Sequence, residues 1–220
     1  MLRLIDGYNR FQREVVAKRA DFFEGLGRGQ SPEALFITCA DSRVVPDLIT
    51  QSDPGDLFVV RNVGNIIPPF GDFIGGVSSA IEYAVMALEV RHIVVLGHSD
   101  CGAMKGTLHP EKVKAMPAVA SWLRHAESAR CVVEENHTHL KTEGERLQAL
   151  IAENVLSQID HLRTHPSVAA KTRRGTLELH GWVYDVATGR INAWDAGARQ
   201  FLPLNRLAAE EPAAALQSVA

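Results

Sequence analysis

The stretch Ala34-Leu35-Phe36-Ile37-Thr38-Cys39-Ala40-Asp41-Ser42-Arg43 decides the fold expected for this chain. It opens on an apolar run, which is typical of a buried strand. Just beyond that run, a thiol, a carboxylate and a guanidinium occupy alternating positions. A second segment has the same design, because Ile93-Val94-Val95-Leu96-Gly97 leads into His98-Ser99-Asp100-Cys101. Two strands that each end in such side chains indicate one shared site.

The rest of the sequence alternates short apolar runs with helical patterns, which indicates an α/β fold. Strands are expected at 34–39, 57–60, 93–96, 177–184 and 191–194. Helices are expected at 46–50, from Ser78 as N-cap, after Cys101, from Pro117, over 143–164 and from Pro166.

The expected sheet is mostly parallel, with strand order 2-1-3-4-5 and helices on both faces. The tight turn at Thr188-Gly189 makes the last two strands antiparallel, so strand 5 is expected at an edge. Ligands of such folds gather where the strand order reverses, at the carboxyl ends of the strands. Cys39 and His98 end the two strands that flank this point.

The 220 residues are expected to form a single domain. An N-terminal helical arm over 1–30 begins with a helix at 3–24, and it can pack either on its own domain or on a partner subunit. The Ala-rich tail over 211–220 contains Pro212 and is expected to be loose.

Composition excludes several functional classes. The net charge is −3, which argues against a nucleic-acid binder. No apolar run approaches the roughly 18 residues of a membrane span. Charge interrupts the first residues, so no signal peptide is expected. The odd count of three cysteines fits a reducing cytoplasm.

Cys39, His98 and Cys101 are the candidate ligands of a zinc ion. Three protein ligands leave one coordination position for water, as in catalytic sites, whereas a structural site would need Asp41 as a fourth ligand. A lone cysteine at a strand end is usually core packing, and only the combination with the His98–Cys101 pair favours metal binding.

Asp41 and Arg43 are expected to pair bidentately, which would hold Asp41 off the metal and near its water. A plain surface ion pair is the alternative. Two thiolates and a neutral imidazole cancel the charge of Zn²⁺, so the ion should acidify water less than a three-histidine site does. Activity is therefore expected to rise toward alkaline pH.

These motifs resemble the β-class carbonic anhydrases along nearly the whole chain. Further matches are 54–62, 81–85 and 180–184. The resemblance implies reversible hydration of carbon dioxide to bicarbonate and a proton by metal-bound hydroxide, with one Zn²⁺ per chain on Cys39, His98 and Cys101. Among subgroups, the sequence looks most like the bacterial type that accompanies cyanase.

The resemblance also implies a site at a homodimer interface, and dimers of the family pair further. Gln30 would hydrogen-bond the substrate, while Phe58, Val63 and Tyr83 would form apolar walls. Gly102 is assigned to the same pocket, where a helix N-terminus can aim amides at the site. His109 is only a nearby guess for the proton shuttle.

A subset of the family places the aspartate on zinc and binds bicarbonate at an inhibitory site. The signature of that subset has tryptophan where this chain has Phe36, although Arg61 and Tyr184 fit it. Gln30 and Phe36 favour the open form, in which water is the fourth ligand of zinc. Other functions stay open: hydrolysis of carbon disulfide or carbonyl sulfide, a redox or zinc sensor with a Cys39–Cys101 disulfide, and a purely structural zinc site.

Overall fold

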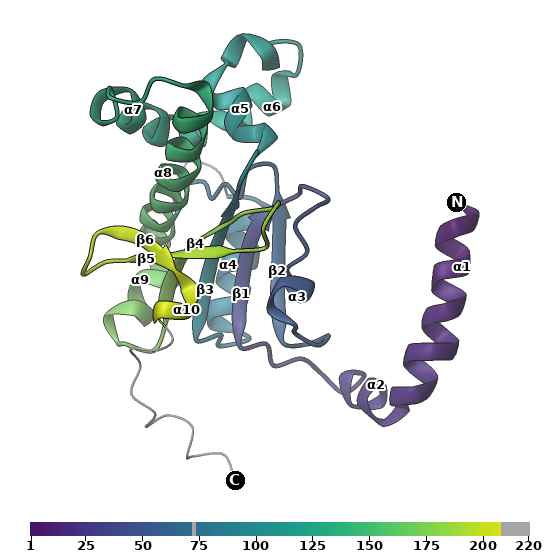
Figure 1. Cartoon of the computed structure of the whole chain (residues 1–220). Helices are drawn as coiled ribbons and strands as arrows, with labels where there is room; N and C mark the ends of the chain where they lie inside the picture. Colours follow the sequence, from purple (N-terminus) through teal and green to yellow (C-terminus); the bar gives the residue numbers. More distant parts are fainter. Residues whose placement is uncertain (72–73, 208–220) are drawn as a thin grey trace.

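The computed structural model describes residues 1–71 and 74–207 of the chain. Its centre is a six-stranded sheet in the order β2-β1-β3-β4-β5-β6 (Figure 1). The strands are β1 (Ala34–Cys39), β2 (Leu57–Asn62), β3 (His92–His98), β4 (Glu178–Tyr184), β5 (Ile191–Asp195) and β6 (Gln200–Pro203). The first four strands run parallel, and β5 and β6 are antiparallel to their neighbours. The expected mostly parallel sheet is therefore confirmed.

The placement of strand 5 at the edge is wrong, because β6 lies outside it. Trp194 on β5 is in register with Phe201 on β6, and their ring centroids are 5.3 Å apart. This cross-strand aromatic pair stabilises the pairing of the four-residue β6 with β5. A run as short as 200–203 carries too little periodicity to be recognised as a strand.

Helices cover the two faces of the sheet unequally. The helices are α3 (Pro46–Thr50), α4 (Gly76–Met86), α5 (Gly102–Leu108), α6 (Pro117–Leu123), α7 (Glu127–Asn136), α8 (Glu143–Thr164), α9 (Pro166–Arg173) and α10 (Leu204–Leu207). The main core packs α4, α8 and α9 on one face, through residues such as Ile81, Ile159 and Val168. On the other face, Phe36 and Val94 form a smaller cluster with Ile49 of α3.

One local prediction needs correction. Ser78 is buried inside α4, whose N-cap is Gly75, so Ser78 is not the cap. By contrast, α8 begins and ends as expected. Thr142 and Glu145 form a capping box at its start.

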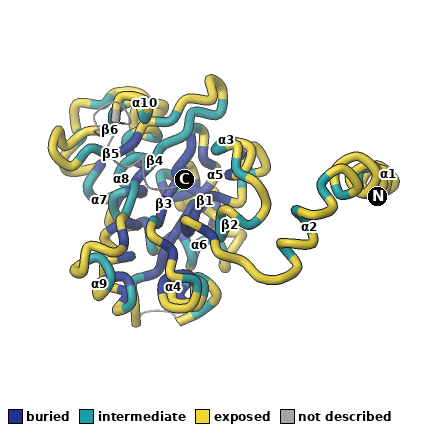
Figure 2. Tube along the Cα trace, turned by 90° about the horizontal axis from the view of Figure 1, so that it is seen from below, coloured by how far each residue is buried: buried dark blue, intermediate teal, exposed yellow. Residues whose placement is uncertain are grey.

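The N-terminal arm is helical but not one regular helix. It consists of α1 (Leu2–Arg10), a π-helical stretch (Phe11–Val16), a 3₁₀ turn (Ala17–Arg19) and α2 (Ala20–Leu26). The arm projects from the body and is exposed around most of its circumference (Figures 1 and 2). Arg19 anchors its base through a bidentate pair with Asp53 at 2.8 and 2.7 Å. The expected tail at 211–220 lies outside the described residues.

Candidate metal centre at the carboxyl ends of β1 and β3

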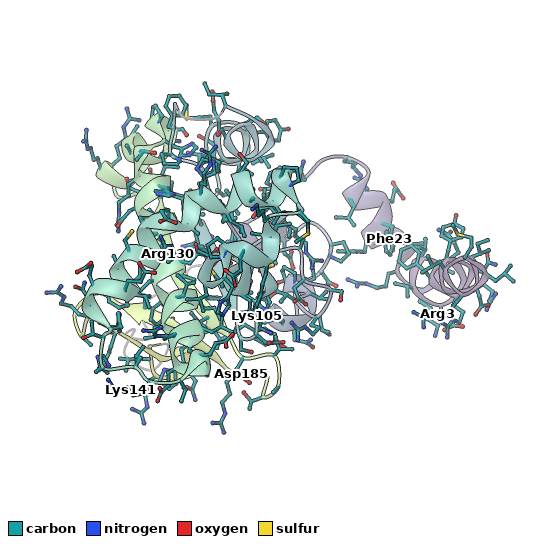
Figure 3. All side chains as sticks on the ribbon, turned by 90° about the horizontal axis from the view of Figure 1, so that it is seen from above. Arg3, Phe23, Lys105, Arg130, Lys141 and Asp185 are labelled. Atoms are coloured by element: carbon teal, nitrogen blue, oxygen red, sulfur yellow. The ribbon has the colours of Figure 1, made fainter. Side chains whose placement is uncertain are left out.

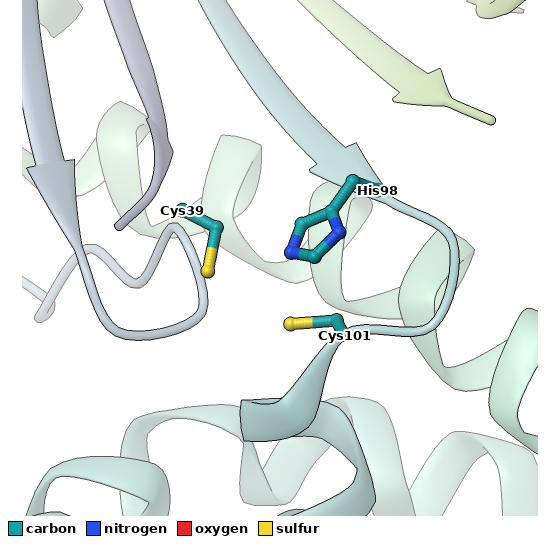
Figure 4. A group of neighbouring side chains, drawn as sticks. All are labelled: Cys39, His98 and Cys101. Atoms are coloured by element: carbon teal, nitrogen blue, oxygen red, sulfur yellow. The ribbon is translucent and has the colours of Figure 1, made fainter. Parts of the chain in front are cut away.

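Three side chains of the kinds that bind metal ions, here called metal-type side chains, meet where the strand order reverses. Cys39 is the last residue of β1, His98 is the last residue of β3, and Cys101 is the N-cap of α5. Their ligand atoms all lie within 4.8 Å of one another, and all three residues are buried (Figure 4). Since β1 and β3 are paired in parallel, the fold brings together groups 59 to 62 positions apart in sequence.

A hydrogen bond from Nδ1 orients the imidazole of His98. Nδ1 lies 2.9 Å from the carbonyl oxygen of Ser99, which can only accept, so Nδ1 carries the proton. Nε2 is therefore left with its lone pair. This atom is buried without a hydrogen-bond partner. A buried nitrogen with a lone pair beside two sulfurs is the arrangement that a thiolate-preferring metal ion would complete.

The two thiols shift each other's pKa in opposite directions. The hydrogen bond from Cys101 is the largest cause that lowers the pKa of Cys39, to about 4. The amide of Gly64 acts in the same direction, because its N–H donates to Cys39 Sγ over 3.4 Å. The pKa of Cys101 is raised by the same contact and by burial. Cys39 is therefore the more acidic thiol of the two.

Asp41 and Arg43 form the expected bidentate pair. Arg43 Nε donates to Asp41 Oδ1 at 2.9 Å and Nη2 donates to Oδ2 at 2.8 Å. These hydrogen bonds hold the pKa of Asp41 well below its usual range. Asp41 Oδ2 still lies 3.9 Å from His98 Nε2, so the carboxylate stands beside the metal-type cluster.

Asp100 joins this pair, a partnership that the sequence did not reveal. Arg43 Nη1 donates to Asp100 Oδ2 at 3.1 Å, and Lys105 also donates to Asp100. Asp100 has a positive φ of 61° in the turn after β3. Its carboxylate contacts Arg43 and Lys105 and is not part of the Cys39, His98 and Cys101 cluster.

Of the five residues assigned to the substrate pocket, two lie at this end of the sheet. Val63 directly follows β2, whose last residue, Asn62, is in register with Cys39. Gly102 begins α5 next to Cys101.

The other three pocket residues lie away from the cluster of the same chain. Phe58 is in register with Leu35, four residues or about 13 Å before the end of β1. Its ring packs on Tyr83 with centroids 6.0 Å apart. Gln30 is exposed in the connection before β1, at the opposite end of that strand.

Arg61 and Phe36, the two residues weighed for the closed subset, make contacts within this chain. Arg61 donates to the carbonyl oxygens of Cys39 at 3.3 Å and Asp41 at 2.7 Å. Phe36 packs edge-to-face on Trp182, with centroids 5.9 Å apart. His109, the guess for the shuttle, lies 2.9 Å from Glu143 and 3.5 Å from Glu111.

Gly64 is a site residue that the sequence reading missed. Its φ is +85°, and a Cβ there would lie 2.8 Å from the Cβ of Ala103. Only glycine fits this position without strain. The signal was present as a glycine in the Asn62-Val63-Gly64-Asn65 segment, but nothing in the sequence linked it to Cys39.

In the part of the chain that the structure describes, none of the helices has the length and apolar character needed to cross a bilayer.

Comparison with known proteins gives one consistent family. The profile described as carbonic anhydrase matches residues 34–191. The carbonic anhydrase of Pseudomonas aeruginosa is 52% identical over 204 residues, covering 93% of this chain and 92% of that protein. Carbonic anhydrase 1 of Escherichia coli O157:H7 is 50% identical over 205 residues, again with 93% and 92% coverage.

Solved structures agree. The β-carbonic anhydrase CcaA superposes with a TM-score of 0.90 at 46% identity, covering 92% of this chain and 91% of that chain. A tetrameric β-carbonic anhydrase of Sordaria macrospora gives a TM-score of 0.79 at 32% identity, with 87% and 94% coverage. Sequence, sheet order and the convergence of two cysteines and a histidine thus agree, and this chain belongs to the β-carbonic anhydrases.

Proposed function

We propose that the chain holds one Zn²⁺ on Cys39, His98 and Cys101 and hydrates carbon dioxide reversibly beside it. The observation that carries this proposal is the buried Nε2 of His98, which lacks a partner and stands beside two cysteine sulfurs. The donor set of two sulfurs and one imidazole nitrogen fits Zn²⁺ and leaves its fourth position open. When bound, the ion would lower the pKa of water and so supply the nucleophile for hydration.

Asp41 and Arg43 are proposed as the catalytic pair of protein groups. With both carboxylate oxygens accepting from Arg43, Asp41 is restrained from turning toward the sulfurs. Asp41 Oδ2 can then accept a hydrogen bond from reacting water and orient it. This pairing supports the open form over the form in which Asp41 is a fourth ligand.

The substrate pocket is proposed to need two chains. Val63 and Gly102 of one chain lie at the site, whereas Gln30, Phe58 and Tyr83 of that chain lie too far from it to take part. Those three residues can therefore contribute only to the site of a second copy. In this arrangement Gln30 would donate to the substrate, and Phe58 and Tyr83 would exclude water.

The arm supports such an assembly. Leu2, Leu4 and Tyr8 are 83%, 67% and 60% exposed within one chain. The first helix of the arm, α1, stands clear of the body, as the position of Arg3 in Figure 3 illustrates. Large apolar side chains on a protruding helix indicate an interface. Together with the tetrameric relative, they support a homodimer that pairs into a dimer of dimers.

Three alternative functions predicted from the sequence would use the same residues. Hydrolysis of carbon disulfide or carbonyl sulfide would use the same groups. Reversible oxidation of the neighbouring Cys39 and Cys101 would instead make a redox sensor, and a permanent Asp41 ligand would make a structural site. The cyanase-associated subgroup, the cytoplasmic location and the single domain over 1–220 stay predictions.

The deciding experiment is stopped-flow hydration of carbon dioxide on protein with measured zinc. We expect about one zinc per chain. Cys39→Ser and His98→Ala should lose both the metal and the activity. Cys131→Ser is the matched control, since Cys131 is exposed and free. Native protein without zinc or without hydration activity would refute the proposal, as would a Cys39→Ser variant that keeps both.

A further inference from the structure

A second group of metal-type side chains lies at the other end of the sheet. His92 is the first residue of β3, while Glu178 is the first residue of β4 and His180 is its third. Their ligand atoms also lie within 4.8 Å of one another. His92 and His98 are the two ends of β3, six residues or about 20 Å apart, so this cluster is separate from the catalytic one.

The register of the sheet explains why the three side chains meet. His92 is directly opposite Glu178, and Val94 is opposite His180. Alternate residues of a strand point to the same face, so all three side chains project from one face of the sheet. The convergence follows from strand pairing and does not depend on a mobile loop.

The atomic geometry is that of a chelate. Nδ1 of His92 lies 3.1 Å from Nε2 of His180, and Oε2 of Glu178 lies 3.7 Å from each of these nitrogens. If a metal ion lay about 2.05 Å from both nitrogens, the nitrogen–metal–nitrogen angle would be about 98°. A small rotation of the exposed Glu178 side chain would bring its oxygen into range.

The cluster is also accessible. His92 and His180 side chains are 33% and 34% exposed. Both line a groove of about 720 Å³ on the face of the sheet that carries Phe36 and Trp182. Two neighbouring cations are already paired, Arg91 with Glu33 at 3.0 Å and Lys171 with Glu89 at 3.3 Å. Their charges therefore oppose an incoming cation less than free side chains would.

We propose that His92, Glu178 and His180 form a second metal site for a divalent transition ion that prefers imidazole, such as Zn²⁺. Two imidazole nitrogens and one carboxylate oxygen suit zinc, nickel and copper, and they do not suit magnesium or calcium. The ion would join the amino ends of β3 and β4 and would keep open positions toward the groove. In the metal-free protein the two imidazoles share one N–H hydrogen bond, which metal binding replaces.

The test is zinc binding by the full-length holoenzyme, which already holds its first equivalent. Equilibrium dialysis against rising Zn²⁺ should reveal a second equivalent per chain. His92→Gln and His180→Gln should weaken its binding by more than about 100-fold, beyond the roughly 10–100-fold that losing an outer-shell partner costs. His109→Gln is the matched control, because His109 is 31% exposed and has two glutamates but no second imidazole.

A second readout guards against a general loss of folding. Excess zinc should raise the unfolding temperature of the wild type and of His109→Gln, since a ligand that binds the native state stabilises it. It should not raise that of His180→Gln. The proposal is overturned if the holoenzyme takes up no second zinc, or if His109→Gln lowers its binding as much as His180→Gln does.

The two metal sites can be separated. Cys39→Ser should lose the first zinc and keep the second, whereas His180→Gln should lose the second and keep both the first zinc and the hydration activity.

Discussion

Asn154 on α8 donates a hydrogen bond from Nδ2 to the carbonyl oxygen of Gly64 over 3.1 Å. The amide of Gly64 in turn donates to Cys39 Sγ over 3.4 Å. Gln158, one turn further along the helix, donates to Asn154 Oδ1 and accepts from the amide of Ile67. A buried polar pair on the long helix thus fixes the loop that contacts the proposed zinc ligand.

Asn154→Leu should disturb this loop. The substitution keeps the number and branching of the side-chain heavy atoms but leaves the Gly64 carbonyl and the Gln158 amide without their partner, at a cost of about 1–3 kcal/mol. We expect lower stability in denaturant and weaker zinc retention under a chelator. Glu153→Gln is the control, because Glu153 lies next in sequence but faces His137. Equal behaviour of the two variants would contradict a positioning role.

Arg43→Ala should keep zinc and lose most hydration activity. Without the guanidinium, Asp41 loses the hydrogen bonds that orient it, and a drop of about 10²-fold or more is expected. Arg43→Lys should not restore the rate, since an ammonium cannot form the planar fork. The measurements are zinc content and stopped-flow rates. Arg124→Ala is the control, since Arg124 bonds within its own helical turn to Ser121. A normal rate in Arg43→Ala would refute the pairing as a catalytic device.

Hydration activity should rise from neutral toward alkaline pH. The two thiolates and neutral imidazole of the donor set cancel the charge of a divalent ion, so water beside it should lose its proton at higher pH than beside three histidines. The check is a stopped-flow profile on protein whose zinc content is measured at each pH. A rate that is flat or falls over this range would speak against the assigned donor set.

Leu4→Glu combined with Tyr8→Glu should weaken self-association. These residues are one helical turn apart and expose apolar surface on the arm. Sedimentation velocity should show smaller species, and hydration activity should fall with them, because the pocket is proposed to need Gln30, Phe58 and Tyr83 of the partner. Lys141→Glu changes the net charge equally at an exposed loop and serves as control. An unchanged oligomer in the arm variant would rule out the arm as part of the interface.

Thr142→Ala should destabilise the start of α8. Thr142 Oγ1 accepts from the Glu145 amide at 3.2 Å, and losing this cap costs about 1 kcal/mol. Ser128→Ala, at an exposed position of α7, should change stability by less than about 0.5 kcal/mol. Equal losses in denaturant unfolding would mean that the cap contributes nothing.

The other half of the capping box adds a pH dependence. Backbone N–H groups of Thr142 and Lys141 hold the pKa of Glu145 below its usual range. A lowered folded-state pKa means that the stabilising effect is present above the ordinary glutamate pKa of about 4.3 and is lost as pH falls through the folded value. The stability difference between wild type and Glu145→Gln should therefore shrink in acid.

Much of the architecture was readable from local patterns. The apolar runs around Phe36 and Val94 are continuous and end in unusual side chains, so both the parallel strands and the converging site followed from them. The extent of α8 was readable because Leu147, Ile151, Val155, Ile159 and Leu162 recur at helical spacing. By contrast, the short β6 and the amide pair Asn154 and Gln158 gave no local signal, since each depends on contacts with residues far away in sequence.

The sequence by itself determined the order of the first five strands and the helices between them, the family and the three candidate metal ligands, because these depend on periodicity and on motifs of a few residues. Only the tertiary structure decided which atoms face one another. It gave His98 a proton on Nδ1, joined Asp100 to Arg43 and gathered His92, Glu178 and His180. Those relationships follow from strand register and helix packing, which are fixed when the whole chain is folded.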